Sequence, residues 1–312
     1  MEAVLRHRGP SGEVGLGSRL DACAQLLGRF VPDAVDHVGA IGPIISPEFE
    51  QYGELIAATD HSLAGLLVRG EGAGFTDRIQ QLLRQWAFGN EAASVHARLA
   101  SAFEHKRCFL KLEWCGHAKG VERQVAIYYR RRPRLHEALK IVTQSAGTTV
   151  ALDDLRELGA LLGKDTVHFV SAVIRPGRPI HYKLYFSQYV TPDSYEAVFE
   201  RLQRALRRFS GQTAAEARWA TYHDRLSSRQ LAHTLFVSLA VSEDGTVPSL
   251  KIDYPGVSPV VAAGLLEGVR LRQTEASLRR LCEAAGRTDL SYLGVRIHAE
   301  GDPVLKGYAD FL

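Results

Sequence analysis

The chain has 312 residues, of which 46% are hydrophobic and 23% charged, and these values are ordinary for a globular protein with a large core. Its formal net charge of +3 is too small to indicate a nucleic-acid partner. No run of about 18 apolar residues occurs, and residues 1–8 lack the apolar core of a signal peptide. We therefore expect a cytoplasmic protein with no membrane partner.

The cysteines are isolated in the sequence, because no two form a CxxC pair and none has the spacing of a metal-ligand set. We expect reduced thiols and no bound metal. The four cysteines are Cys23, Cys108, Cys115 and Cys282.

Residues 1–16 are rich in Gly and Arg and are expected to form a flexible N-terminus, with residues 17–312 forming a single domain. A helix is predicted first, over residues 19–30. Five pairs of strand-like segments follow, and turn signals such as Pro176-Gly177 and Asp244-Gly245 join their members. The predicted hairpins pair 54–59 with 63–69, 109–114 with 124–131, 167–174 with 182–190, 234–241 with 250–254, and 292–298 with 304–309.

Two amphipathic segments separate each hairpin from the next, with apolar residues at helical spacing. The predicted helices cover residues 76–88, 91–104, 135–144, 152–162, 194–209, 214–226, 259–271 and 275–285.

Residues 181–190 alternate polar and apolar side chains with a period of two. Lys183 and Tyr185 therefore face one way. The apolar Leu184 and Phe186 face the opposite way. Related strand positions recur 55 to 68 residues apart, at residues 69, 126, 183, 251 and 306. The chain is thus interpreted as repeated copies of one unit, each contributing a polar strand face to a common place.

Hairpins are antiparallel, and ten such strands with helices over one face can remove their edges by closing into a barrel. The sequence predicts an α/β protein: a ten-stranded antiparallel β-barrel of five α-β-β-α repeats with an outer ring of helices. This barrel is wider than one that side chains fill, so a ligand cavity is expected. The residues predicted to face outward, against the helices, are Val125, Ile127, Leu184, Phe186, Ile252, Tyr254 and Leu305.

Cations and tyrosines occupy the strand positions predicted to face inward. Arg296 joins them, because a turn centred near Gly301 would place it opposite Lys306. The predicted inward cations are Arg69, Lys183, Lys251, Arg296 and Lys306, and the tyrosines are Tyr128, Tyr185 and Tyr308. Two positions depart from the pattern, with Asp253 in place of a tyrosine and Ala126 in place of a cation.

Several cations in one water-restricted cavity repel one another unless an anion neutralises them, and a diphosphate suits that requirement. Tyrosine faces attract cations, by about 0.5–1 kcal/mol when exposed and about 2 kcal/mol when desolvated. The combination favours an allylic diphosphate. The cations would stabilise the departing diphosphate, and the rings would shield the allyl cation from water.

The repeated lysine-x-tyrosine strands resemble the soluble aromatic prenyltransferases of the ABBA barrel type, including the dimethylallyltryptophan synthase-like and cyanobactin peptide branches. The resemblance covers residues from about 50 to 312, and its best matches are residues 183–186 and the last hairpin. It implies transfer of a short prenyl group, dimethylallyl or geranyl, from its diphosphate to an aromatic, indole or peptide side-chain acceptor. It also implies a monomer without a required cofactor, in which Mg²⁺ is at most stimulatory.

The same resemblance points to a carboxylate on the first strand of the first hairpin as acceptor anchor or base, which is Glu54. Glu113 is the competing candidate. Either would accept the acceptor's proton or bind its N–H or O–H group.

Several alternatives stay open at this point. A non-catalytic barrel that binds an anionic isoprenoid or other phospho-ligand would use the same cations, and a helix–sheet interaction protein would have no buried cationic cluster. Asp153 and Asp154 suggest either a metal-binding motif or compensation of a helix dipole, and we favour the second. Residues 130–134 are interpreted as a solvated basic loop, with attraction of a leader peptide as the alternative. His168 is interpreted as a packed histidine.

Overall fold

The computed structural model describes residues 53–58, 62–105, 107–117, 120–146, 152–210, 213–242, 249–266, 268–296 and 303–311. The expected flexible N-terminus and the helix over 19–30 lie outside these residues. The strands are β1 (Gly53–Ala58), β2 (Ser62–Gly70), β3 (Cys108–His117), β4 (Gly120–Tyr129), β5 (Phe169–Ile174), β6 (His181–Val190), β7 (His233–Ser242), β8 (Ser249–Val257), β9 (Leu290–Arg296) and β10 (Val304–Phe311).

The helices alternate with the hairpins along the chain. They are α3 (Gly72–Gln85), α4 (Gly89–Ala102), α5 (Leu135–Ala146), α6 (Leu152–Leu162), α7 (Tyr195–Ser210), α8 (Thr213–Leu226), α9 (Pro259–Ala263) and α10 (Gly268–Ala284), with a short 3₁₀ turn, η3 (Pro192–Ser194), before α7.

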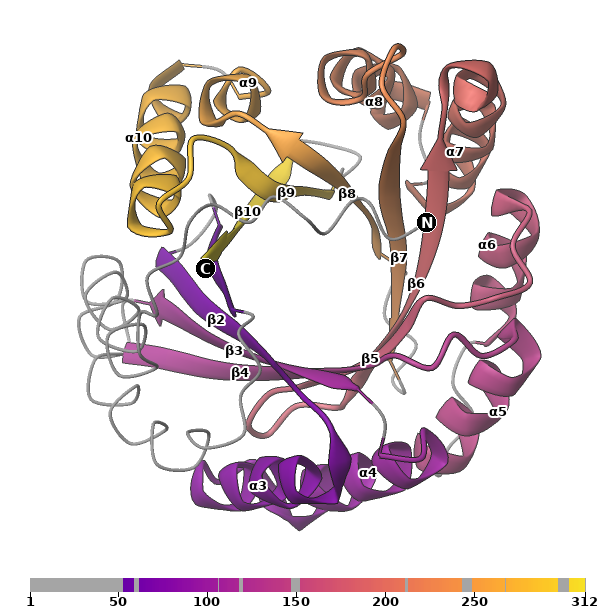
Figure 1. Ribbon diagram of the computed structural model, residues 1–312, viewed down its shortest axis with the longest axis vertical. Helices are drawn as coiled ribbons and strands as arrows, with labels where there is room; N and C mark the ends of the chain where they lie inside the picture. Colours follow the sequence, from indigo (N-terminus) through magenta and orange to yellow (C-terminus); the bar gives the residue numbers. More distant parts are fainter. Residues whose placement is uncertain are drawn as a thin grey trace.

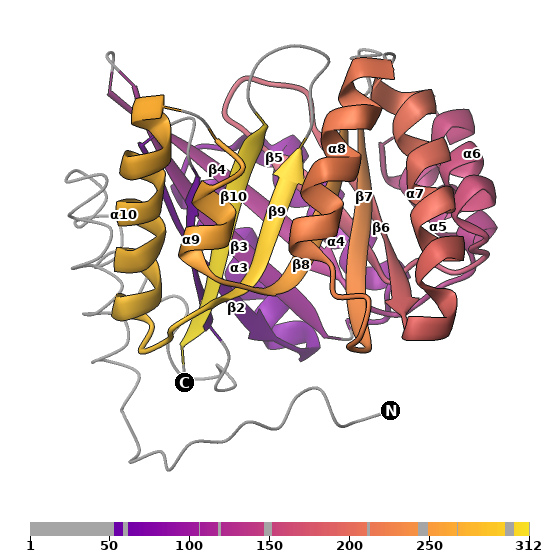
Figure 2. The same cartoon turned by 90° about the horizontal axis from the view of Figure 1, so that it is seen from above.

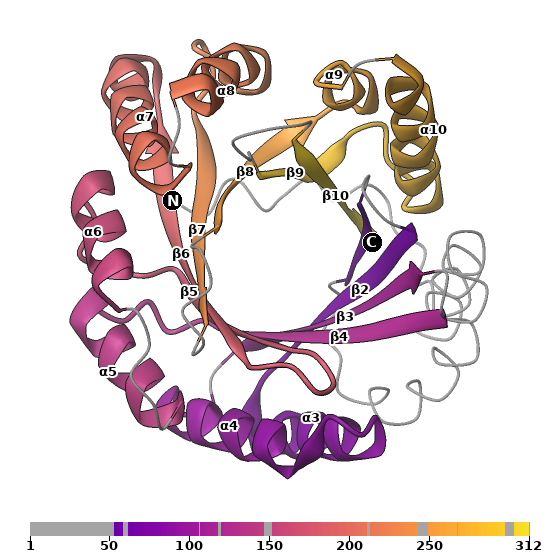
Figure 3. The same cartoon turned by 180° about the vertical axis from the view of Figure 1, so that it is seen from behind.

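The strands form one antiparallel sheet that curls until its ends meet. Each strand pairs with its neighbours in the chain, and β1 also pairs with β10, from Gly53 opposite Phe311 to Ala58 opposite Lys306. Figures 1 and 3 show the strands around a common centre with the helices outside them. Figure 2 views the molecule from above, with α8 and α9 in front of the strands. The expected antiparallel α/β architecture, with helices on one face, is confirmed.

The outer face of the sheet and the apolar stripes of the helices form the main core. Leu184 and Phe186 of β6 are fully buried there, together with Leu202 of α7. All seven residues that the alternation predicted to face outward belong to this core. At Gly307 the outer face of β10 lies so close to α10 that an added Cβ atom would stand 2.6 Å from Leu278 Cδ2. Close helix packing, rather than a turn, therefore excludes a side chain at this position.

Three helix predictions are wrong at their boundaries, and one of them is the helix expected over 275–285, which begins at Gly268. The helix expected over 76–88 begins earlier, at Gly72, and Thr76 lies inside it with its hydroxyl donating to the Gly72 carbonyl at 3.3 Å. The helix expected over 259–271 is divided. Ser258 caps α9, which has only 5 residues and ends before Gly264. The helix pairs of the expected repeats are therefore unequal in length.

The structure also bears on the expectations about the cysteines and about membrane-spanning segments. The described cysteines, Cys108, Cys115 and Cys282, are unpaired thiols, and Cys23 lies outside the described residues. In the part of the chain that the structure describes, no helix is long and apolar enough to cross a membrane.

Candidate functional site

The strand register places the predicted cations and tyrosines on the inner face of the sheet. Residues directly opposite one another on paired strands share a face. Lys183 lies opposite Ser171 and Ala240, and Tyr185 lies opposite Phe169 and Ser238. Following these pairs from strand to strand around the barrel shows that all eight predicted residues share the inner face. They are Arg69, Tyr128, Lys183, Tyr185, Lys251, Arg296, Lys306 and Tyr308.

The last hairpin pairs differently from the expectation. Arg296 lies opposite Val304, and Lys306 lies opposite Gly294. The centre of this hairpin is therefore one residue earlier than the expected Gly301, and the pairing shifts by two residues. Because an even shift keeps side chains on the same face, both cations still point inward.

Three of the other four predicted cations lie close to Lys183, together with Lys111. Burial lowers the pKa of Lys183 well below its usual range, and the neighbouring cations lower it further. No ion pair to Lys183 occurs within the described residues. We call this group the lysine cluster: Lys111, Lys183, Lys251, Arg296 and Lys306. Such a cluster favours binding of a multiply charged anion.

Among the residues whose side chains the structure describes, Glu113 is one of two carboxylates inside the lysine cluster. It is fully buried, and its Oε1 atom forms ion pairs with Lys306 and, at 3.1 Å, with Lys111. Its Oε2 atom accepts from the Gln124 amide, whose own oxygen accepts from Arg175 Nε at 2.5 Å. Burial alone would raise the pKa of Glu113, but Lys111 and Lys306 outweigh this effect and hold the pKa well below its usual range. Glu113 is therefore a permanent anion.

Asp253 is the second carboxylate, and it neutralises Lys251. The Lys251 ammonium lies 2.7 Å from Asp253 Oδ1 and donates to the Tyr308 hydroxyl at 2.8 Å. Gly294 makes room for this contact, because a Cβ atom there would stand 2.6 Å from Lys251 Cε. Burial lowers the pKa of Lys251 to about 8 despite the opposing charge of Asp253. Burial likewise lowers the pKa of Lys306 to about 8, although Glu113 raises it.

Aromatic rings line the interior next to the lysine cluster. The ring centroids of Tyr128 and Tyr185 are 5.5 Å apart, and Phe169 contacts both at 6.3 and 6.2 Å. Lys251 lies 4.9 Å from the centroid of Tyr308, and Lys111 lies 5.6 Å from that of Tyr128. The interior thus places ring faces beside fixed positive charge, the arrangement that stabilises a bound cation next to an anion.

Lys111 is the main residue that the sequence reasoning missed. It lies directly opposite Ala126, so it supplies the charge that position 126 lacks. The alternation of Lys111 and Glu113 on one strand was a usable signal, because residues two apart share a face. Gln124 and Arg175 gave no such signal, since only the folded chain brings them to Glu113.

Two predicted residues stand apart from the lysine cluster. Arg69 has the inward register, but its charge acts on Arg130, near the end of the barrel where helices connect the strands. Glu54 has the register of an inward residue, opposite Leu67 and Asp310. Its side chain lies outside the described residues.

The structure also shows the surroundings of Asp153, Asp154 and His168, whose roles the sequence left open. Asp153 pairs with Arg156 at 2.5 Å, and Asp154 pairs with Arg208 at 3.3 Å, both in the first turn of the outer helix α6. Among the described residues no cluster of His, Cys, Asp or Glu could hold a metal ion. His168 is packed, as expected, with its ring 4.5 Å from that of Phe169.

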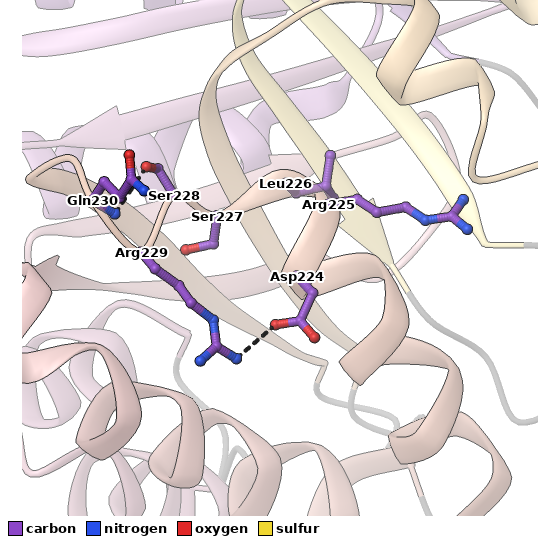
Figure 4. Close-up of a pocket in the computed structure, with 7 residues that line it drawn as sticks. All are labelled: Asp224, Arg225, Leu226, Ser227, Ser228, Arg229 and Gln230. Carbon is purple, nitrogen blue, oxygen red and sulfur yellow. Dashed lines mark hydrogen bonds and ion pairs between the residues drawn. The ribbon is translucent and has the colours of Figure 1, made fainter.

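A surface pocket at the end of α8 is separate from the interior. Figure 4 shows that its lining comes from one continuous stretch, residues 224–230, in which Arg229 pairs with Asp224 at 3.2 Å. Arg229 also pairs with Glu196, and Arg225 donates to the Gly264 carbonyl at 3.1 Å. Both arginines thus have partners, so this pocket is not a candidate for the chemistry of the interior.

No protein-family model and no curated protein matches the sequence of the chain. Solved structures do match its fold. 5-Dimethylallyltryptophan synthase from Streptomyces coelicolor is 12% identical with a TM-score of 0.61, and the match covers 95% of this chain and 97% of that one. NotF prenyltransferase is 10% identical with a TM-score of 0.64, covering 98% and 97%. PriB, in a ternary complex with L-tryptophan and dimethylallyl thiolodiphosphate, is 14% identical with a TM-score of 0.59, covering 95% and 96%. The expected likeness to aromatic prenyltransferases is confirmed at the level of the fold.

Proposed function

We propose that this protein is an aromatic prenyltransferase that moves a short allylic group, dimethylallyl or geranyl, from its diphosphate to an aromatic, indole or peptide side-chain acceptor. One observation carries the proposal. The five cations of the lysine cluster lie beside Tyr128, Tyr185 and Tyr308 inside a barrel whose fold is that of known aromatic prenyltransferases. PriB and NotF have both been solved in complex with dimethylallyl thiolodiphosphate, which supports a dimethylallyl donor here.

In the proposed reaction the bond between the allylic carbon and the diphosphate oxygen breaks, and its electron pair leaves with the diphosphate. The lysine cluster stabilises that developing charge. The allylic carbon then forms a bond with an electron-rich acceptor atom, and the acceptor loses a proton. Tyr128, Tyr185 and Tyr308 would face the allyl cation and keep water from it.

Glu54 is the better candidate for the acceptor anchor or base. Both oxygens of Glu113 are occupied, and its low pKa makes it a weak proton acceptor. A carboxylate held in this way organises lysines rather than taking protons. Glu54 lies near the start of β1, where the register places it level with Leu67 and Lys111, two residues along the strands from the level of Glu113.

The function is tested by incubating the full chain with dimethylallyl or geranyl diphosphate and a panel of indoles, phenols and tryptophan- or tyrosine-containing peptides. Mass spectrometry then detects acceptors that gain one prenyl group. An acceptor-dependent release of diphosphate with a matching mass gain supports the proposal. Tight donor binding without product across the panel, and without slow donor hydrolysis, would instead support a non-catalytic barrel that binds an anionic isoprenoid.

Transfer is expected to survive a chelator. The lysine cluster would provide the positive charge that Mg²⁺ provides elsewhere, so about the same rate should be measured with excess EDTA, and added Mg²⁺ should at most stimulate. Loss of nearly all activity in EDTA, with recovery on adding Mg²⁺, would contradict this expectation.

Diphosphate binding is expected to take up protons near pH 8.5. Lys251 and Lys306 have pKa values of about 8, so in the free protein both lose protons as the pH rises through that value. A bound anion favours the charged form and raises both pKa values, so binding above about pH 8 must add protons. Calorimetry in buffers of different ionisation enthalpy measures this uptake. Lys251→Met should reduce it, and proton release at pH 8.5 would contradict the prediction.

A further inference from the structure

A second group of cations lies at the end of the interior where helices, rather than hairpin turns, connect the strands. There β2 ends, β3 begins and β4 ends side by side, because Cys108 pairs with Gly70 and Tyr129. Arg69 lies at an inward position near the end of β2, Arg107 immediately precedes β3, and Arg130 and Arg132 follow β4. We call this group the arginine collar: Arg69, Arg107, Arg130 and Arg132.

Arg130 is the central member of the arginine collar. Its side chain extends over the interior, with the guanidinium carbon 5.8 Å from the centroid of the Phe169 ring. Burial lowers its pKa, and the charges of the other three collar arginines lower it further. Within the described residues, neither Arg130 nor Arg132 has a carboxylate partner. The neighbouring Arg131 does, since it pairs outward with Glu104 at 2.7 Å.

An aromatic layer lies directly beneath the arginine collar. The Phe169 ring contacts Phe109 at 5.6 Å and Phe236 at 6.1 Å, and Phe236 contacts Tyr292 at 5.6 Å. These four side chains are only half-buried, unlike the fully buried rings of the outer core. His168 packs beside them, and burial together with Arg130 and Arg132 lowers its pKa to about 3, so it is neutral. The layer offers ring faces to a flat ligand.

We propose that the arginine collar binds the carboxylate of the acceptor, so that the acceptor is an aromatic acid whose ring lies on the aromatic layer. This inference rests on the proposed prenyl transfer. The diphosphate has its own cations in the lysine cluster, near the hairpin end of the interior. A planar guanidinium matches a carboxylate with two parallel hydrogen bonds, and Arg130 stands one layer above the rings that would hold the acceptor.

The test compares matched pairs of aromatic acids and amides: L-tryptophan with L-tryptophanamide, and indole-3-acetate with indole-3-acetamide. Calorimetry measures their binding to the full chain as wild type, Arg130→Gln, Arg132→Gln and the control Arg131→Gln. At least one acid should bind about 10- to 100-fold more tightly than its amide, the range for a hydrogen-bonded charge pair. Arg130→Gln should remove most of this preference, and Arg131→Gln should keep it. Arg132→Gln provides the same test if Arg130→Gln does not fold.

Three results would overturn the proposal: no acid binds, acids and amides bind equally, or Arg130→Gln weakens inorganic diphosphate binding as much as acid binding. The last result would assign the collar to the donor. These results differ from a failure of the proposed function. If the protein is not a prenyltransferase, no prenylated product forms, but acids can still bind more tightly than amides in a way that depends on Arg130. Conversely, equal prenylation of acids and amides would leave the function intact and exclude the carboxylate site.

Discussion

Lys183→Met is expected to lower kcat/KM for the prenyl donor by about 10²–10³-fold, the effect of removing one preorganised group that stabilises developing negative charge. Lys183 lies among four other cations, and no carboxylate of the described residues pairs with it. Its charge is therefore available to an anion. Lys140→Met, on the exposed face of α5, removes the same charge away from the site and is the matched control.

The same substitution should leave the protein as stable as before, or more stable. The pKa of Lys183 is lower in the folded protein than in the unfolded chain, so the unfolded chain binds the proton more strongly. Keeping this lysine in the folded protein therefore costs stability at pH 7, and methionine removes that cost. Urea unfolding at pH 7 measures the free energy of unfolding. A clear loss of stability, or activity within about threefold of wild type, would count against Lys183 as a donor-binding residue.

Glu54→Gln is expected to lower acceptor prenylation by about 10²–10⁴-fold, the usual contribution of a general base. The change keeps the size of the side chain and removes its negative charge. Donor binding should change little, because the cations of the lysine cluster hold the diphosphate. Rates of prenylated product and of donor hydrolysis, measured together by mass spectrometry and diphosphate release, separate the two effects.

Glu113→Gln is the informative comparison for Glu54→Gln. It leaves Lys111 and Lys306 buried without their shared counter-ion, which should cost about 3–5 kcal/mol in the free energy of unfolding. Glu54→Gln should not have this cost. If Glu54→Gln prenylates at the wild-type rate while a folded Glu113→Gln does not, the base assignment moves to Glu113.

The inner and outer faces of the strands were predictable because the alternation of side chains is a local property of extended backbone. Lys183 and Phe186 face opposite ways in any sheet that contains β6. The inward placement survived even the error in the last hairpin, because the pairing of Arg296 shifted by two residues and not by one. Helix boundaries were less predictable, as Ser258 and Gly264 show, since packing against the sheet decides where a short helix ends.

The sequence by itself determined which residue types point into the interior: lysines, arginines and tyrosines on one face of alternating strands. Only the tertiary structure decided which of them meet. Strands far apart in the chain bring Lys306 to Glu113 and Lys251 to Tyr308, and these contacts depend on the closure of the sheet. The structure also separates Arg69 from the other predicted cations, which join Lys111 in the lysine cluster. The physical reason is that the direction of a side chain follows from its own strand, whereas its electrostatic partner depends on the register between strands.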